Sequence, residues 1–165
     1  MRIFGVTGWK NTGKTTLMER LVSEIISRGL SVSTIKHAHH NVDVDQPGKD
    51  SYRHRQAGAQ QVILASANRW ALMTEMRGAD EPPLAALLEK LAPVDLVLIE
   101  GYKRNDHPKI EASIAPSKRE LIALTDPTIC AVAAGYDPDG LTQPVLPIND
   151  IAAIADFILM EVGLG

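Results

Sequence analysis

A glycine-rich loop near the N-terminus constrains this 165-residue chain more than any other feature. Residues 8–15 read Gly-Trp-Lys-Asn-Thr-Gly-Lys-Thr and match the pattern G-x-x-x-x-G-K-[ST] in full. An apolar run precedes the loop at residues 2–7, and an amphipathic helical pattern follows it at residues 14–28. In this strand–loop–helix setting, the backbone N–H groups of the loop cradle phosphate groups at the start of a helix.

The loop predicts a role for each of its polar side chains. The ammonium of Lys14 reaches the terminal phosphates of a nucleoside triphosphate, and the hydroxyl of Thr15 binds Mg²⁺. Some dimeric phosphate-loop ATPases carry an extra lysine directly after the first glycine. Because Trp9 stands there, no trans-acting role is assigned to Lys10. The predicted nucleotide-binding residues of the loop are Gly8, Trp9, Lys10, Asn11, Thr12, Gly13, Lys14, Thr15 and Thr16.

Length and charge exclude several classes of protein. A chain of this length is expected to form a single phosphate-loop nucleotide-binding domain spanning residues 1–165. The net charge of −3 comes from scattered charges, which argues against nucleic-acid binding through a basic face. No run approaches the ~18 apolar residues that a membrane-spanning helix needs. The single cysteine, Cys130, cannot form an internal disulfide. We therefore expect a cytoplasmic protein with no membrane contact.

Apolar patterning predicts the order of the secondary structure. Short apolar or alternating runs alternate with helical patterns, and a tight turn at residues 66–68 predicts a hairpin. This order favours an α/β fold of the P-loop NTPase type, with a mostly parallel sheet, helices on both faces and a local antiparallel hairpin. Strands are predicted at residues 2–7, 31–35, 61–65, 69–74, 95–99, 109–114, 121–124 and 129–133, and helices at residues 14–28, 50–57, 82–91 and 151–162.

An acidic partner for the phosphate loop is expected at the end of a parallel strand. The apolar run around residues 95–99 is flanked by Asp95 and Glu100, which lie roughly 16 Å apart in an extended strand at ~3.3 Å per residue. Ligands bind at the carboxyl ends of parallel strands, so Glu100 is the candidate and Asp95 lies at the wrong end. Glu100 is predicted to bind Mg²⁺ or to orient the attacking water. Lys14 and Glu100 are thus the predicted catalytic pair.

A polar loop at residues 36–49 follows the second predicted strand and should emerge at the same edge of the sheet. Asp43 or Asp45 is placed to approach the metal, and Asp45 joins Thr15 and Glu100 in the predicted metal set. The histidines of the loop fit no tetrahedral zinc spacing. An anion-binding role, with Lys36, Arg53, Arg55 and Lys103, is favoured over a metal site. The predicted substrate-binding residues are Lys36, His37, His39, His40, Asp50, Arg53 and Lys103.

An ordered set of motifs resembles the molybdopterin-guanine dinucleotide biosynthesis protein B (MobB) family. The matches run nearly from end to end of the chain, which makes the set far more specific than the phosphate loop alone. The residue after Glu100-Gly101 departs mildly from the family, with Tyr102 in place of phenylalanine. The segments that carry the resemblance are residues 8–16, 35–40, 43–52, 57–59, 69–75, 98–103 and 148–150.

The resemblance implies a GTP-binding, weakly hydrolysing homodimer that uses Mg²⁺. It implies a partner, a MobA-like guanylyltransferase that joins GMP to molybdopterin, and it implies molybdopterin as a ligand. The N-K-x-D motif with which GTPases commonly read guanine is absent. Asn149 and Asp150 can offer an amide and a carboxylate to a base, although Asp150 is equally explained as a helix N-cap. A metallochaperone GTPase and a small-molecule kinase remain alternative interpretations.

Overall fold

The computed structural model of this protein describes residues 1–38 and 43–165, which form two compact units. Unit 1 comprises residues 1–37 and 91–165, and unit 2 is the segment 38–90 inserted between two strands of unit 1. The prediction of a single domain does not anticipate this division. No helix within residues 1–38 and 43–165 is both long enough and apolar enough to cross a bilayer.

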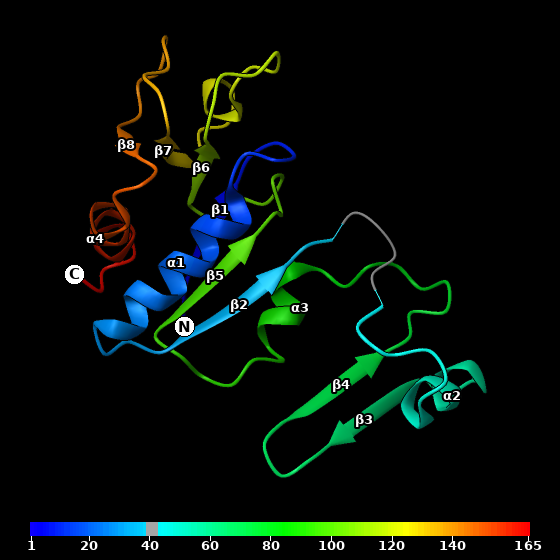
Figure 1. Ribbon diagram of the computed structural model, residues 1–165. Helices are drawn as coiled ribbons and strands as arrows, with labels where there is room; N and C mark the ends of the chain where they lie inside the picture. Colours follow the sequence, from blue (N-terminus) through cyan, green and yellow to red (C-terminus); the bar gives the residue numbers. More distant parts are fainter. Residues whose placement is uncertain (39–42) are drawn as a thin grey trace. The chain divides into compact units, whose positions relative to one another are not determined.

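Unit 1 is built on a six-stranded sheet in which every pair of neighbouring strands is parallel (Figure 1). The strand order is β2-β5-β1-β6-β7-β8, so the strand that precedes the phosphate loop lies inside the sheet. The predicted mostly parallel α/β fold is confirmed. The strands are β1 Arg2–Thr7, β2 Val32–Lys36, β5 Leu96–Glu100, β6 Lys109–Ser113, β7 Ile129–Ala134 and β8 Val145–Pro147.

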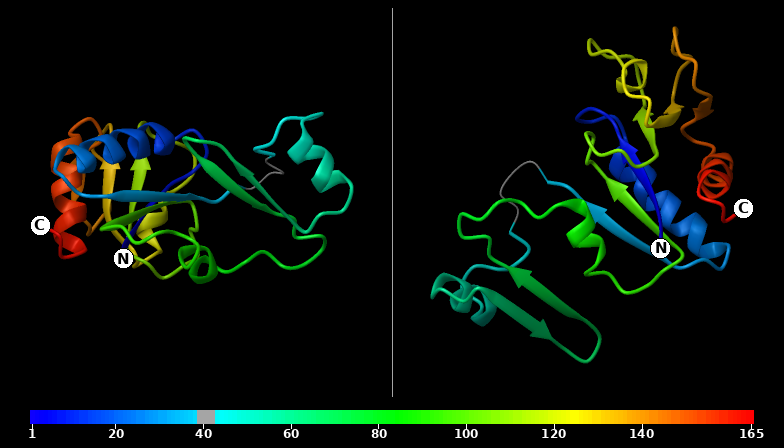
Figure 2. Two further views of the ribbon diagram at one scale, coloured as in Figure 1. Left: turned by 90° about the horizontal axis from the view of Figure 1, so that it is seen from below. Right: turned by 180° about the vertical axis from the view of Figure 1, so that it is seen from behind.

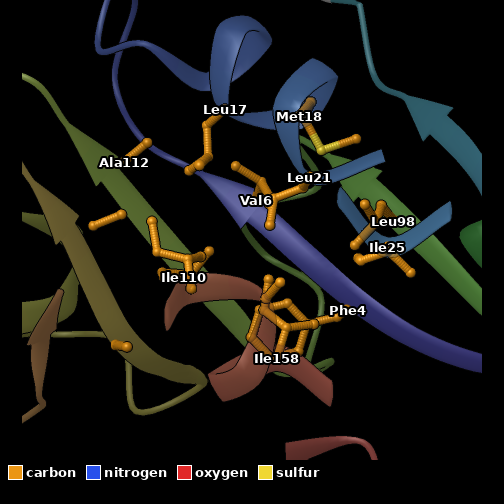
Figure 3. Close-up of a cluster of buried hydrophobic side chains, with 14 of the residues drawn as sticks. Phe4, Val6, Leu17, Met18, Leu21, Ile25, Leu98, Ile110, Ala112 and Ile158 are labelled. Carbon is orange, nitrogen blue, oxygen red and sulfur yellow. The ribbon is translucent and has the colours of Figure 1, made fainter. Parts of the chain in front are cut away.

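One face of this sheet carries the main apolar core. Helices α1 (Lys14–Ser27) and α4 (Ile151–Glu161) pack against each other and against the sheet (Figure 2). Every third or fourth residue of α1 from Leu17 to Ile25 is buried, as the helical pattern predicts. In Figure 3 these side chains meet Val6 of β1, and Ile158 of α4 meets Phe4. This packing holds the start of α1 against the end of β1.

The opposite face of β1 and β6 is buried but polar. Alternation along β6 directs Ile110 and Ala112 into the main core, which leaves Lys109, Glu111 and Ser113 on the other side, all 3% exposed or less. The Lys109 ammonium donates to the backbone oxygens of Asn105 at 2.6 Å and His107 at 3.0 Å, and to the Thr128 hydroxyl. A short 3₁₀ helix, Ile122–Leu124, packs on the outer face of β7.

The buried His107 beside this strip makes folding sensitive to acid. Burial, with a smaller effect from the nearby Lys109 ammonium, lowers the pKa of His107 from 6.5 to about 4. The contribution of the neutral His107 ring to stability is therefore complete above its pKa in the unfolded chain. That contribution is lost as the pH falls toward its lower pKa in the folded protein. Between roughly pH 7 and pH 5 we expect the wild-type protein to lose about 2 kcal/mol more unfolding free energy than His107→Gln. Urea unfolding of both proteins at the two pH values measures this, and equal losses would contradict it.

Unit 2 contains a two-stranded antiparallel sheet and two short helices. Strands β3 (Gln61–Ala65) and β4 (Trp70–Thr74) form the predicted hairpin, and α2 (Asp50–Gln56) contacts β3 (Figure 1). Helix α3 (Leu84–Leu88) begins after two prolines and is shorter than predicted.

A single arginine ties unit 2 together. The Arg55 guanidinium contacts carboxylate oxygens of Asp43 at 2.7 Å and Asp45 at 3.2 Å. It also contacts Glu75 at 2.6 Å, and the Ser51 hydroxyl donates to Asp45 at 2.9 Å. Hydrogen bonds from Arg55 to Asp43 and Glu75 raise the pKa of the guanidinium. The segment that begins at Asp43 is therefore anchored to both α2 and the hairpin.

In unit 1, one predicted element is wrong and one strand is missing from the prediction. The predicted strand at residues 121–124 is the 3₁₀ helix, because the backbone N–H of Ala123 turns toward the Glu111 carboxylate at 2.9 Å instead of joining a sheet. Strand β8 was not predicted. Its three residues include Pro147, which lacks the donor that strand patterns rely on, and it occupies the sheet edge where proline is tolerated. The remaining boundaries agree to within a few residues.

Candidate functional site

The phosphate loop connects the carboxyl end of β1 to the amino end of α1. Gly8 and Gly13 have positive φ angles of 138° and 91°, and Asn11 between them has a φ of 63°. Inside the loop, the Thr12 hydroxyl donates to the Trp9 carbonyl at 2.9 Å. Helix α1 begins at Lys14, and no side chain caps its first backbone N–H groups. A helix start of this kind favours a bound anion.

Close packing explains why the loop has glycine at both ends. A Cβ on Gly8 would lie 2.6 Å from the Ala112 carbonyl oxygen of β6. A Cβ on Gly13 would lie 2.5 Å from the side chain of Ile114. Neither position has room for a side chain, and both φ angles disfavour one. The close approach of β6 and of Ile114 after it therefore requires glycine at both ends of the loop.

The Lys14 ammonium folds back over the loop and donates to the Trp9 carbonyl oxygen. Its pKa is lowered, first by burial and then by the nearby cations Lys103 and Lys36, with Glu100 and Glu111 acting in the opposite direction. Burial is the largest cause of the lowered pKa, and Lys103 and Lys36 add positive charge near the loop. An anion placed there would stabilise these cations.

Glu100 lies where strand polarity predicts it, at the carboxyl end of β5. The register pairs Val6 of β1 with Glu100, which brings the carboxylate beside the start of α1. Its Oε1 lies 3.4 Å from the Thr15 hydroxyl and 3.2 Å from the Lys36 ammonium. The Glu100 side chain is only 12% exposed. Two oxygen ligands of the kind that Mg²⁺ prefers therefore meet at the phosphate loop.

Asp95 lies at the opposite end of β5 and has a structural role. Its Oδ2 accepts hydrogen bonds from the backbone N–H of Ser31 at 2.8 Å and from the Ser31 hydroxyl at 2.6 Å. These bonds lower the pKa of the Asp95 carboxyl. They fasten the start of β5 to the turn before β2, which agrees with the exclusion of Asp95 from the site.

Residues after β2 and β5 also gather at this edge. The His37 ring stacks on the Tyr102 ring with centroids 4.6 Å apart, and the His37 N–H donates to the Glu100 carbonyl at 2.9 Å. Tyr102 has a positive φ of 47°, so the chain turns sharply after the strand. The turn leads to Lys103, whose ammonium lies 4.3 Å from the centre of the Trp9 ring. Thus Lys36, His37 and Lys103 of the predicted substrate set lie near the phosphate loop.

The other predicted residues of the polar loop belong to unit 2 or lie outside the description. The carboxylate of Asp45 pairs with the Arg55 guanidinium and accepts a hydrogen bond from the Ser51 hydroxyl. Asp50 and Arg53 form a weak pair at 3.8 Å on the exposed side of α2. His39 and His40 fall outside the described residues. Within residues 1–38 and 43–165, no group of three or more His, Cys, Asp or Glu side chains is arranged to hold a metal ion.

The predicted base-binding pair lies between β8 and α4. The Asp150 carboxylate accepts the backbone N–H of Ala153 at 3.1 Å, which makes it the N-cap of α4. The backbone oxygen of Asn149 accepts from Arg20 at 2.8 Å, and the side chains of Asn149 and Asp150 are exposed. The prediction that Asp150 is a helix N-cap is therefore confirmed. A base-binding role for Asn149 and Asp150 stays a prediction.

Sequence reasoning missed two residues close to the loop. Glu111 of β6 lies opposite Thr7 in the register and is 1% exposed, and its Oε1 and the Thr7 hydroxyl have no hydrogen-bond partner among the described residues. Burial raises the pKa of Glu111. Arg119 lies with its guanidinium 4.8 Å from the Trp9 ring. Glu111 could have been noticed in the sequence, because it is a charged residue within an apolar strand. Nothing in the sequence indicates the contact of Arg119 with Trp9, because the two residues are far apart in the chain.

A parallel sheet with the phosphate loop after an internal strand, and with Lys14 and Thr15 at the start of α1, defines a P-loop NTPase-like fold. The family model for molybdopterin guanine dinucleotide synthesis protein B (MobB) matches residues 3–135. The chain therefore belongs to the MobB family.

Relatives agree over nearly the whole chain. The molybdopterin-guanine dinucleotide biosynthesis adapter protein of Haemophilus influenzae is 44% identical over 162 residues, covering 94% of this chain and 86% of that protein. The adapter protein of Escherichia coli K12 is 40% identical, covering 95% and 91%. The crystal structure of Bacillus subtilis MobB matches with a TM-score of 0.79 at 26% identity over 98% of both chains. The MobB homologue of Bacillus stearothermophilus matches with a TM-score of 0.71 at 27% identity over the full length of both.

Proposed function

We propose that this chain is an adapter protein of molybdopterin guanine dinucleotide biosynthesis that binds GTP with Mg²⁺ and hydrolyses it slowly. In this role it assists a MobA-like guanylyltransferase that joins GMP to molybdopterin, and it binds molybdopterin itself. The observation that carries the nucleotide proposal is the meeting of Lys14, Thr15 and Glu100 where β1 and β5 end. The pathway is proposed from the names of the relatives.

Electrostatics at the loop supports a polyphosphate ligand. Burial lowers the pKa of Lys14 most, and the nearby Lys103 and Lys36 lower it further, while Glu100 and Glu111 act in the opposite direction. Free N–H groups at the start of α1 add a positive dipole end. A triphosphate would supply the missing negative charge, and Lys14 would exchange the Trp9 carbonyl for phosphate oxygens.

The donor set at the loop fits Mg²⁺. Thr15 and Glu100 offer hard oxygen ligands, and the phosphates of a nucleotide supply the others. Bound Mg²⁺ would neutralise charge that develops on the phosphates during hydrolysis. Glu100 would hold the metal or the attacking water, and its ion pair with Lys36 fixes the position of its carboxylate before the nucleotide arrives.

The hairpin of unit 2 supports the homodimer part of the proposal. The β3–β4 sheet has only two strands, which are marginal by themselves, and both outer edges are unpaired in it. Its apolar side chains are exposed to an unusual extent: Ile63 is 65% exposed, Leu64 55% and Trp70 68%. A second copy of the chain would pair with an edge of this sheet and cover these side chains. Sedimentation analysis tests this, and a monomer throughout the concentration range would overturn it.

Calorimetric titration with nucleotides tests the proposal directly. In the presence of Mg²⁺ we expect GTP to bind at least about tenfold more tightly than ATP, a difference of roughly 1.4 kcal/mol. A preference for ATP would overturn the guanine assignment. A wild-type protein that binds neither nucleotide would overturn the whole proposal. For the adapter role, adding the chain to a guanylyltransferase, GTP and molybdopterin should increase formation of the guanine dinucleotide, and no increase would count against it.

A further inference from the structure

Unit 1 contains a cavity of about 810 Å³ beside the phosphate loop. Its wall is formed by Trp9, by the segment that leads into β6 and by the segments on either side of the 3₁₀ helix. Cavities of ~300–1,000 Å³ are typical of small-molecule sites. Of the predicted nucleotide-binding residues, only Trp9 is among the residues that line this cavity.

Trp9 is held firmly in the wall of the cavity. Its indole N–H donates to the backbone oxygen of Glu120 at 2.8 Å. Lys103 and Arg119, from two different segments, place their cationic groups 4.3 Å and 4.8 Å from the centre of the ring. Aromatic rings attract cations in this way. The ring therefore gathers two positive charges at the cavity.

These cations have no carboxylate partner of their own. Within residues 1–38 and 43–165, no carboxylate oxygen lies within 4.0 Å of the charged groups of Lys103, Arg104 or Arg119. Asp106, Glu120 and Asp126 also line the cavity, and the Asp126 carboxylate accepts from the hydroxyl and the N–H of Thr128 at 2.6 Å and 2.9 Å. Burial and the neighbouring Arg119 lower the pKa of Lys103. Lys103 and Arg119 therefore stand at the Trp9 ring without an ion pair to a described carboxylate, and they can contact an anionic group of a ligand.

The rest of the wall has an apolar part. Leu121, Ile122 and Pro127 line the same cavity. We propose that the cavity binds a small organic phosphate, with its phosphoryl group between Lys103 and Arg119 and its apolar body against Leu121, Ile122 and Pro127. This site adjoins the site of the nucleotide phosphates, since Trp9 and Lys103 lie beside both, and it does not depend on which base is selected there.

Trp9 links the two sites. Its ring forms the wall of the cavity, and its carbonyl oxygen accepts from Lys14. A ligand that moves Trp9 would change the position of this carbonyl, and a nucleotide that recruits Lys14 would release it. Coupling between two ligands is reciprocal, so each would alter the affinity for the other.

Trp9 fluorescence tests the site when the phosphate loop is disabled. Trp70→Phe leaves Trp9 as the one tryptophan, and Lys14→Ala removes the main phosphate cation of the loop. We expect inorganic phosphate and phenyl phosphate each to change Trp9 emission saturably in this double variant. Phenyl phosphate should bind about tenfold more tightly, because its ring is buried against the apolar wall.

Three further substitutions in the double variant decide the outcome. Lys103→Gln and Arg119→Gln should each weaken phenyl phosphate binding roughly tenfold, as expected for a lost charge-assisted contact. Lys118→Gln removes an equal charge from the residue before Arg119, and Lys118 does not line the cavity. It should leave phenyl phosphate binding unchanged. The proposal is overturned if the double variant shows no saturable change, or if its response survives both Lys103→Gln and Arg119→Gln. GTP binding is measured separately with Lys14 intact, so failure of the nucleotide site is distinguishable from failure of the cavity.

Discussion

Replacing Lys14 with alanine is expected to weaken GTP binding roughly 100-fold, a loss of about 3 kcal/mol. Lys14 is the cation at the start of α1, and its ammonium now rests on the carbonyl of Trp9, a neutral acceptor that a phosphate would replace. Burial and neighbouring cations lower its pKa, so the free loop favours an arriving anion. Without Lys14, the backbone N–H groups and the dipole of α1 would remain, which is why weak binding should persist.

Calorimetry with GTP and Mg²⁺ measures the loss. Lys118→Ala is the matched control, since it removes an equal positive charge from an exposed position of unit 1. It should bind GTP like the wild type. Because the Lys14 side chain is only partly buried, the variant should keep its fold, and its thermal melting curve verifies this. An unchanged dissociation constant for a folded Lys14→Ala protein would contradict the phosphate-loop assignment.

Replacing Glu100 with glutamine is expected to slow GTP hydrolysis ~100-fold while changing GTP affinity by less than about threefold. Glutamine keeps the size of the side chain, so the packing at the end of β5 is preserved. The carboxylate charge that faces Thr15 and pairs with Lys36 is lost. In the proposed mechanism, metal binding and orientation of the attacking water would both depend on that charge, whereas the phosphates would be held mainly by the loop. The expected signature is therefore a fall in kcat with little change in binding.

The same strand offers a control for Glu100. Asp95→Asn removes a carboxylate from the other end of β5, where it accepts hydrogen bonds from Ser31. This variant should be somewhat less stable but should hydrolyse GTP at the normal rate per folded molecule. Phosphate release at saturating GTP compares the three proteins. Normal turnover by Glu100→Gln would remove Glu100 from the mechanism.

Much of unit 1 could be predicted because its signals are local. Residues 8–15 carry a fixed spacing, the apolar run that ends at Glu100 identifies a buried parallel strand, and the polarity of such strands separates Glu100 from Asp95. Predictions were wrong where distant residues decide the backbone. Residues 121–124 look like a strand by composition, yet the Glu111 carboxylate draws the N–H of Ala123 into a turn. Nothing close to Ala123 in sequence announces that carboxylate.

The polar loop after β2 also depends on distant contacts. Its acidic residues predict a metal ligand, and in the structure Arg55 of α2 contacts Asp43 and Asp45. The metal role of Asp45 stays a prediction. The sequence does not distinguish an arginine that is free in solvent from one, like Arg55, whose guanidinium pairs with three carboxylates. Which charges pair is decided only when the helix and the hairpin pack together.

By itself, the sequence determined the phosphate loop, the parallel strands around it and the identity of the acid at its edge, because each rests on spacing or alternation within a few residues. Tertiary structure alone decided that Trp9 of this loop would hold Lys103 and Arg119 and form the wall of a separate cavity. These side chains meet because β5 and β6 both lie beside β1 in the sheet, and Lys103 follows β5 while Arg119 follows β6. Contacts between residues so far apart in the chain leave no periodic pattern, and only the packing of the strands brings them together.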